Sequence, residues 1–180
     1  MTVSIMLKSG KILLHVCCAP CATACVERLL ANERQVVLFF SNSNIDTSEE
    51  FEKRLLHVHH LASAFKVPVL VDPYNHEKWL QSIVGLESEP EKGARCVRCF
   101  NFSLSRAADK AREIGIEAFT TTLTVSPHKS SQTIFNIGER FSGFESWNFK
   151  KLNGFKRSLE LSQKLELYRQ NYCGCEFSRH

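Results

Sequence analysis

The chain has 180 residues, of which 43% are hydrophobic and 23% charged, a balance typical of a globular protein with a buried core. It contains no run of about 18 apolar residues, which excludes a membrane-spanning helix. The first ten residues lack the long apolar core of a secretion signal, which argues against export. The sequence therefore predicts one domain, residues 1–180, that acts in the cytoplasm without a membrane partner.

Positive charge is concentrated near the C-terminus. The chain has 23 Lys and Arg residues against 19 Asp and Glu, and residues 149–180 contain seven of the basic and three of the acidic ones. The rest of the chain is therefore balanced. A basic face of this kind can meet a polyanion, although charge alone more often marks a solvated helix face.

Short apolar runs alternate with helical patterns along the chain. Four apolar runs predict buried strands at residues 11–17, 35–41, 67–72 and 117–122. Helices are predicted from Pro20, from Thr47, and at residues 76–84, 96–114, 131–141 and 158–168, with a polar loop at 85–95. Thr47 and Glu50 have the spacing of a capping box. Strands separated by helices predict a mostly parallel sheet in a three-layer α/β domain with a helical C-terminal region.

Eight cysteines are many for a chain without an export signal, and they are clustered. They occupy positions 17, 18, 21 and 25, then 96 and 99, then 173 and 175. Clustered thiols in a reducing compartment indicate metal binding or redox chemistry rather than a disulfide scaffold. Cys25 lies on the apolar stripe of its helix and is expected in the core. Cys21, one turn earlier, can face either the core or the site.

The predicted sheet brings two of these clusters together. Cys17 and Cys18 follow the first strand, while Cys96 and Cys99 begin the helix that leads into the fourth strand. Ligands of open α/β sheets bind at the carboxyl ends of the strands. Four thiolates fit zinc or an iron–sulfur cluster, and the adjacent pair favours a cluster. The turn after the first strand has no glycine, which argues against phosphate binding there.

The cysteines of the C-terminal tail, Cys173 and Cys175, flank a single glycine. The glycine lets the backbone bend so that the two sulfurs can form a strained and therefore reducible ring. Alternatively, both cysteines bind a second mononuclear metal ion, iron or zinc, together with Cys21. Either interpretation places the tail in the site.

Five segments, taken together, resemble a known family. They are HVCCAPC (15–21), RCVRC (95–99), TTTLTVSPHK (120–129), IFNIG (134–138) and YRQNYCGCEFS (168–178). In this order they resemble the QueH-type epoxyqueuosine reductases, which are metal-dependent enzymes of the tRNA queuosine pathway. The match runs from Lys11 to Ser178. Ser43 departs from the proline that relatives usually carry in that loop.

The resemblance implies a nucleotide-hydrolase-like (Rossmann-like) fold and a single catalytic domain. The implied substrate is tRNA carrying epoxyqueuosine at the wobble position, which is reduced to queuosine with an unidentified electron donor. The resemblance also implies a [4Fe-4S] cluster and a redox-active pair of thiols. The implied cluster ligands are Cys17, Cys18, Cys96 and Cys99, and the implied redox pair is Cys173 and Cys175.

Reduction of an epoxide requires a proton donor. The candidates are His15, Asp46 and His128, of which His128 follows the fourth strand in a loop where site residues gather. Trp79 and Trp147 are interpreted as packing residues rather than base-stacking ones.

Binding of tRNA requires basic residues beside the site. The best candidates for contacts with phosphate are Lys150, Lys151, Lys156 and Arg157. The residues by themselves are also compatible with two other classes of function. A thiol–disulfide oxidoreductase would use a cysteine pair without iron, and a zinc-stabilised RNA-binding module would have no redox activity.

Overall fold

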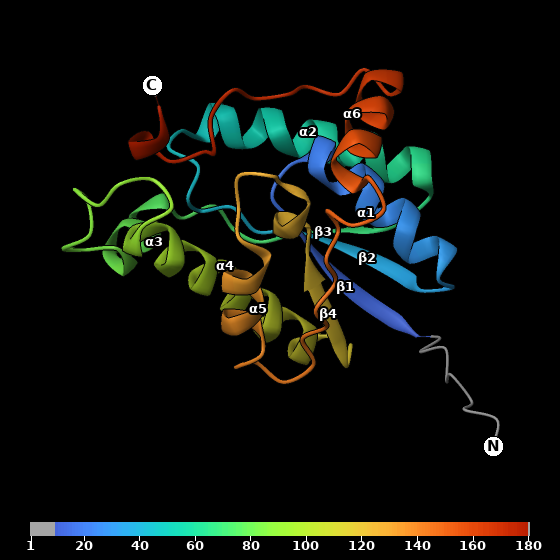
Figure 1. The fold of residues 1–180 in the computed structure, drawn as a ribbon, viewed down its shortest axis with the longest axis horizontal. Helices are drawn as coiled ribbons and strands as arrows, with labels where there is room; N and C mark the ends of the chain where they lie inside the picture. The colour runs from blue at the N-terminus through green and yellow to red at the C-terminus, as the bar shows by residue number, and fades with distance from the viewer. Residues whose placement is uncertain (1–9, 180) are drawn as a thin grey trace.

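The computed structural model describes residues 10–179 (Figure 1). Residues 1–9 lie outside this range, and they include most of the segment whose lack of an apolar core predicts that the protein is not exported. Between residues 10 and 179, no helix has both the length and the apolar character needed to cross a membrane.

The sheet has four strands, all parallel, in the order β3-β2-β1-β4. Their bounds are Lys11–Val16 (β1), Gln35–Phe40 (β2), Val69–Val71 (β3) and Ala118–Thr121 (β4). All four predicted strands are present; β3 covers half of the predicted residues 67–72, and the others are one or two residues shorter than predicted. The register places His15 of β1 between Phe39 of β2 and Thr121 of β4.

The helices follow the predicted order. They are α1 (Ala19–Ala31), α2 (Ser48–Phe65), α3 (His76–Ser82), α4 (Ala94–Glu113), α5 (Ser131–Gly138) and α6 (Gly154–Lys164), with short 3-10 turns η1 (Thr122–Val125) and η2 (Glu176–Ser178). Pro20 lies in the first turn of α1, and the Thr47 side chain accepts a hydrogen bond from the Glu50 amide at 3.2 Å, so the predicted cap is confirmed.

The last predicted helix is displaced. It was expected at residues 158–168, but α6 starts at Gly154 and ends at Lys164. Its end is followed by Glu166, whose backbone has a positive φ of 52° and so cannot continue a right-handed helix. The residues after it form an extended tail, which the helical pattern of apolar residues did not reveal.

Helices cover both faces of the sheet (Figure 1). Helices α1 and α2 pack on one face, with α6 against α1, while α4 and α5 lie on the other. Successive side chains of β1 point to opposite faces of the sheet, so Leu14 packs toward α1 and Leu13 toward α4. The protein is thus a three-layer, Rossmann-like α/β domain with a parallel sheet, as predicted.

The loops that build the site leave the carboxyl ends of the strands. Residues 17–18 connect β1 to α1, residues 41–47 connect β2 to α2, and η1 directly follows β4. The tail after α6 runs back over α2 toward α3 (Figure 1). These two loops, η1 and the tail, which are far apart in sequence, therefore meet at the carboxyl end of the sheet.

Candidate active site

Seven of the eight cysteines line one cavity of about 880 Å³. They come from the start of α1, the start of α4 and the tail. The seven are Cys17, Cys18, Cys21, Cys96, Cys99, Cys173 and Cys175. The eighth, Cys25, is fully buried in the core cluster between the sheet and α1, as its position on the apolar stripe predicted.

The tightest group of thiols lies at the start of α1. The sulfurs of Cys17, Cys18 and Cys21 all lie within 4.8 Å of one another. Thr122 holds Cys17 in place, because its hydroxyl accepts from the Cys17 amide at 3.1 Å and donates to the Cys17 sulfur at 3.2 Å. Thiolates favour zinc and iron–sulfur centres, so this donor set fits a metal centre.

Cys21 therefore faces the cavity, which its position in the sequence left undecided. The sequence paired it with the tail cysteines in a second metal site, whereas its sulfur lies beside those of Cys17 and Cys18. The assignment of each cysteine to one centre or the other stays a prediction.

The three thiols differ in acidity. Hydrogen bonding to the Cys18 sulfur raises the pKa of Cys17 to about 12. The bonds that Cys18 receives from Cys17 and Cys21 lower its own pKa well below the usual value. Hydrogen bonds to both neighbours raise the pKa of Cys21. Cys18 is thus the most acidic thiol of the group, and the thiolate is the form that binds metal.

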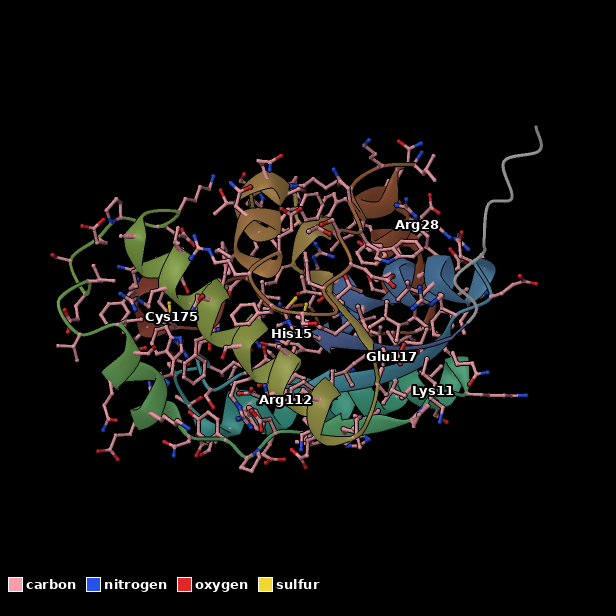
Figure 2. All side chains as sticks on the ribbon, turned by 90° about the horizontal axis from the view of Figure 1, so that it is seen from below. Lys11, His15, Arg28, Arg112, Glu117 and Cys175 are labelled. Carbon is pink, nitrogen blue, oxygen red and sulfur yellow. The ribbon has the colours of Figure 1, made fainter. Side chains whose placement is uncertain are left out.

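The second group of thiols lies between α3, α4 and the tail. The indole nitrogen of Trp79 donates to the sulfur of Cys99 at 3.3 Å, and burial raises the pKa of Cys99. Cys175 is buried in a cluster with Trp79 and Ile83, and Figure 2 shows it at the end of the molecule near α3. Cys173, by contrast, is exposed. The two tail thiols therefore have different environments.

His15 is a buried structural group. Its Nε2 lies 3.1 Å from the carbonyl of Ser41 and its Nδ1 lies 2.9 Å from the hydroxyl of Thr121. A carbonyl can only accept, so Nε2 carries the proton and Nδ1 accepts from Thr121. Burial lowers the pKa of His15 to about 4. A neutral imidazole with both nitrogens bonded is poorly suited to donate protons to a substrate.

The other proton-donor candidates are less enclosed. His128 is exposed on the rim of the cavity, and Asp46 is engaged by Tyr172 and Arg179 of the tail. Lys129, which no sequence pattern indicated as a site residue, lines the cavity next to His128. Burial opposes its charge, but nearby thiols, Cys173 first among them, raise the pKa of Lys129 above its usual value.

The four basic residues predicted to contact tRNA differ in their surroundings. Lys150 lines the cavity, and its amine donates to the carbonyl of Lys129. Lys151 and Lys156 are exposed. Arg157 forms ion pairs with the carboxylates of Glu27 and Glu160, so part of its charge is already neutralised.

A buried arginine fixes the tail. The side chain of Arg54, on α2, is 2% exposed and forms an ion pair with Glu50 at 2.7 Å. Its guanidinium also donates to the carbonyl of Cys173 at 2.9 Å and lies over the ring of Tyr172. The amide of Asp46 donates to the carbonyl of Gly174 at 2.9 Å. The backbone between the two tail thiols is therefore anchored, a role of Arg54 that no sequence pattern indicated.

Comparison with known proteins identifies the family. The family model described as epoxyqueuosine reductase QueH matches residues 12–180. The chain belongs to the QueH family. The resemblance predicted from the five segments is thus confirmed, and the family is one of oxidoreductases.

Individual QueH relatives are similar over most of their length. Proteins named epoxyqueuosine reductase QueH from Streptococcus pyogenes and Thermotoga maritima are each 38% identical to the chain, over 178 and 177 residues. These matches cover 93% and 94% of the chain, and 69% and 90% of the relatives. A relative of the same name from Acinetobacter baylyi is 36% identical over 176 residues, which are 94% of the chain and 81% of the relative.

Protonation of His15 should destabilise the fold. Its pKa is 6.5 in the unfolded chain and about 4 in the folded one, so its stabilising contribution is complete above pH 6.5 and is lost as the pH falls toward 4. Between pH 7 and pH 5, the free energy of unfolding of wild type should fall by roughly 2 kcal/mol more than that of His15→Gln, as measured by urea unfolding. His60→Gln, at an exposed position of α2, is the control. Equal pH dependence in wild type and His15→Gln would contradict this role.

Loss of the Arg54 side chain should release the tail. Arg54→Met removes the donor to the Cys173 carbonyl and leaves Glu50 without its ion-pair partner, a change that costs about 3–5 kcal/mol where a pair is buried. We expect trypsin to cleave the folded variant faster after Arg169, at the start of the tail. Arg157→Met, which breaks an exposed ion pair with Glu27, should leave that rate unchanged. Equal rates in the two variants, both folded by circular dichroism, would show that Arg54 does not hold the tail.

Proposed function

We propose that the chain reduces epoxyqueuosine in tRNA to queuosine, the last step of queuosine biosynthesis, in the cytoplasm. One observation carries the proposal: seven cysteines from three distant segments line a single cavity together with Lys129. A reductase needs such a cavity to hold a redox centre and a reacting group side by side.

The thiols of the cavity suit a metal-based redox centre. Our proposed ligands for a [4Fe-4S] cluster are Cys17, Cys18, Cys96 and Cys99, which all line the cavity. As an alternative to a redox role of the tail thiols, Cys21 would bind a second ion, iron or zinc, with Cys173 and Cys175, which line the same cavity. When bound, an iron–sulfur centre supplies electrons one at a time. The exposed Cys173 and buried Cys175 are proposed as a thiol pair that supplies or buffers the second electron.

Conversion of an epoxide to an alkene needs two electrons and two protons. Both carbon–oxygen bonds of the epoxide break, a carbon–carbon double bond forms, and the oxygen leaves as water. The electrons come from an external donor. The ammonium group of Lys129 is suited to hold a proton at the departing oxygen, where negative charge develops, and His128 at the rim is suited to relay protons from solvent.

The cavity has a volume suited to one modified nucleoside. Small-molecule sites usually measure about 300–1,000 Å³, and the cavity has about 880 Å³. An enzyme that acts on a base must take that base out of its stack, so the wobble nucleoside would enter the cavity alone. Lys150, Lys151, Lys156 and Arg157 would then contact the phosphates that stay outside.

Iron and acid-labile sulfide in protein purified without oxygen test the proposed centre. We expect both in roughly equal amounts, and their loss in Cys18→Ala and Cys99→Ala. Cys25→Ala is the matched control, because Cys25 lies in the core rather than in the cavity, and it should keep both. Wild type should then reduce epoxyqueuosine in tRNA with a chemical reductant, and the two depleted variants should not.

The alternatives give different results in the same experiment. Zinc without sulfide, even after anaerobic reconstitution, would exclude the proposed mechanism and favour a zinc-stabilised RNA-binding module. A colourless protein that lacks metal but exchanges thiols and disulfides would favour a thiol–disulfide oxidoreductase.

The salt dependence of tRNA binding tests the basic residues. Each phosphate contact contributes about 0.7–0.9 to the slope of log K against log salt concentration. The double variant Lys150→Ala/Lys151→Ala should therefore bind more weakly, with a slope smaller in magnitude by about 1.5. Lys164→Ala, in the last turn of α6, is the control and should leave the slope unchanged. An unchanged slope in the double variant would show that neither lysine contacts a tRNA phosphate.

A further inference from the structure

Trp79 does more than fill space beside the cavity. It lies on α3 and is 1% exposed, so the interpretation as a packing residue is confirmed. A buried indole N–H nevertheless needs an acceptor, because an unpaired donor is costly away from water. The acceptor of Trp79 is the sulfur of Cys99, at 3.3 Å. The hydrogen bond is therefore directed at a cysteine of the cavity wall.

Neighbouring side chains fix the orientation of this indole. The ring of His76 stacks on it with centroids 5.4 Å apart and an angle of 19°, and the ring of Phe177 lies 6.5 Å away. His76 is itself held through Nδ1 at the carbonyl of Ser43 and through Nε2 at the carboxylate of Glu176, at 2.8 and 3.2 Å. The indole thus lies against His76 of its own helix and Phe177 of η2.

We propose that Trp79 is a positioning residue that orients the Cys99 thiolate and raises the reduction potential of the centre that Cys99 helps to hold. This inference rests on the proposed function, because it takes Cys99 as a ligand. Reduction adds negative charge to an iron–sulfur centre, and part of that charge resides on the ligating sulfurs. A hydrogen bond to a sulfur stabilises the reduced state, and such bonds tune the potentials of these centres.

The second tryptophan of the chain provides a matched control. The ring nitrogen of Trp147 donates to the carboxylate of Glu145 at 2.9 Å, and its ring stacks on Phe149. Trp147 does not line the cavity. Trp79→Phe and Trp147→Phe thus remove the same group, one beside the proposed centre and one away from it.

An anaerobic potentiometric titration of the iron-loaded protein tests the inference. We expect a more negative midpoint potential for Trp79→Phe than for wild type, at equal iron and sulfide content. Trp147→Phe should have the wild-type potential. Equal potentials in both variants, with the centre fully loaded, would overturn the tuning role.

A second measurement detects the hydrogen bond itself in the loaded protein. Exchange into D2O should shift the iron–sulfur stretching bands of wild type in the resonance Raman spectrum, and this shift should be smaller in Trp79→Phe. If Trp79→Phe does not fold, benzothienylalanine at position 79 keeps the shape of the ring and removes only the N–H. An isotope shift as large as in wild type would show that Trp79 does not donate to the centre.

The two proposals fail in different ways. Absence of iron and sulfide from wild type would refute the proposed centre, and the tuning role with it. A loaded centre whose potential and isotope shift do not respond to the loss of the Trp79 N–H would refute the tuning role alone.

Discussion

The site depends on a buried imidazole that joins the carboxyl ends of three adjacent strands. His15 lies on β1, and its ring is bonded to Thr121 at the end of β4 and to the carbonyl of Ser41 just after β2. Two residues later the chain reaches Cys17, whose amide and sulfur both contact Thr122. Because these bonds join β1 to the strands on either side, they hold in place the start of the loop that carries Cys17.

The tail is held by different forces. It has little regular structure of its own, and ordering each of its residues costs about 1–2 kcal/mol of backbone entropy. Polar contacts offset this cost at points spaced along the tail. Tyr168 donates to Glu50, Arg54 donates to the Cys173 carbonyl, and the Asp46 amide donates to the Gly174 carbonyl. The positions of the tail thiols thus depend on side chains of α2 and on the loop that precedes it, rather than on local folding of the tail.

The sequence predicted what local patterns encode. Strand order along the chain, the Thr47 cap and the burial of Cys25 follow from apolar periodicity and capping chemistry, which act over a few residues. The roles of Arg54 and Trp79 could not be predicted, because each depends on a partner brought near by the fold, 119 and 20 residues away in sequence. The direction of Cys21 was undecided for a similar reason, since a position one turn from the core stripe fits either side of a helix.

The position of Cys18 shows how a common fold serves sulfur chemistry. In nucleotide-binding α/β sheets the glycine-rich turn after the first strand lets backbone amides reach phosphate at a helix N-terminus. Here that turn is Cys-Cys-Ala-Pro, and Cys18 is the N-cap of α1 with an extended backbone. The positive end of the helix dipole therefore faces a thiolate instead of a phosphate. Together with the hydrogen bonds from Cys17 and Cys21, it stabilises the negative charge that a metal ligand needs.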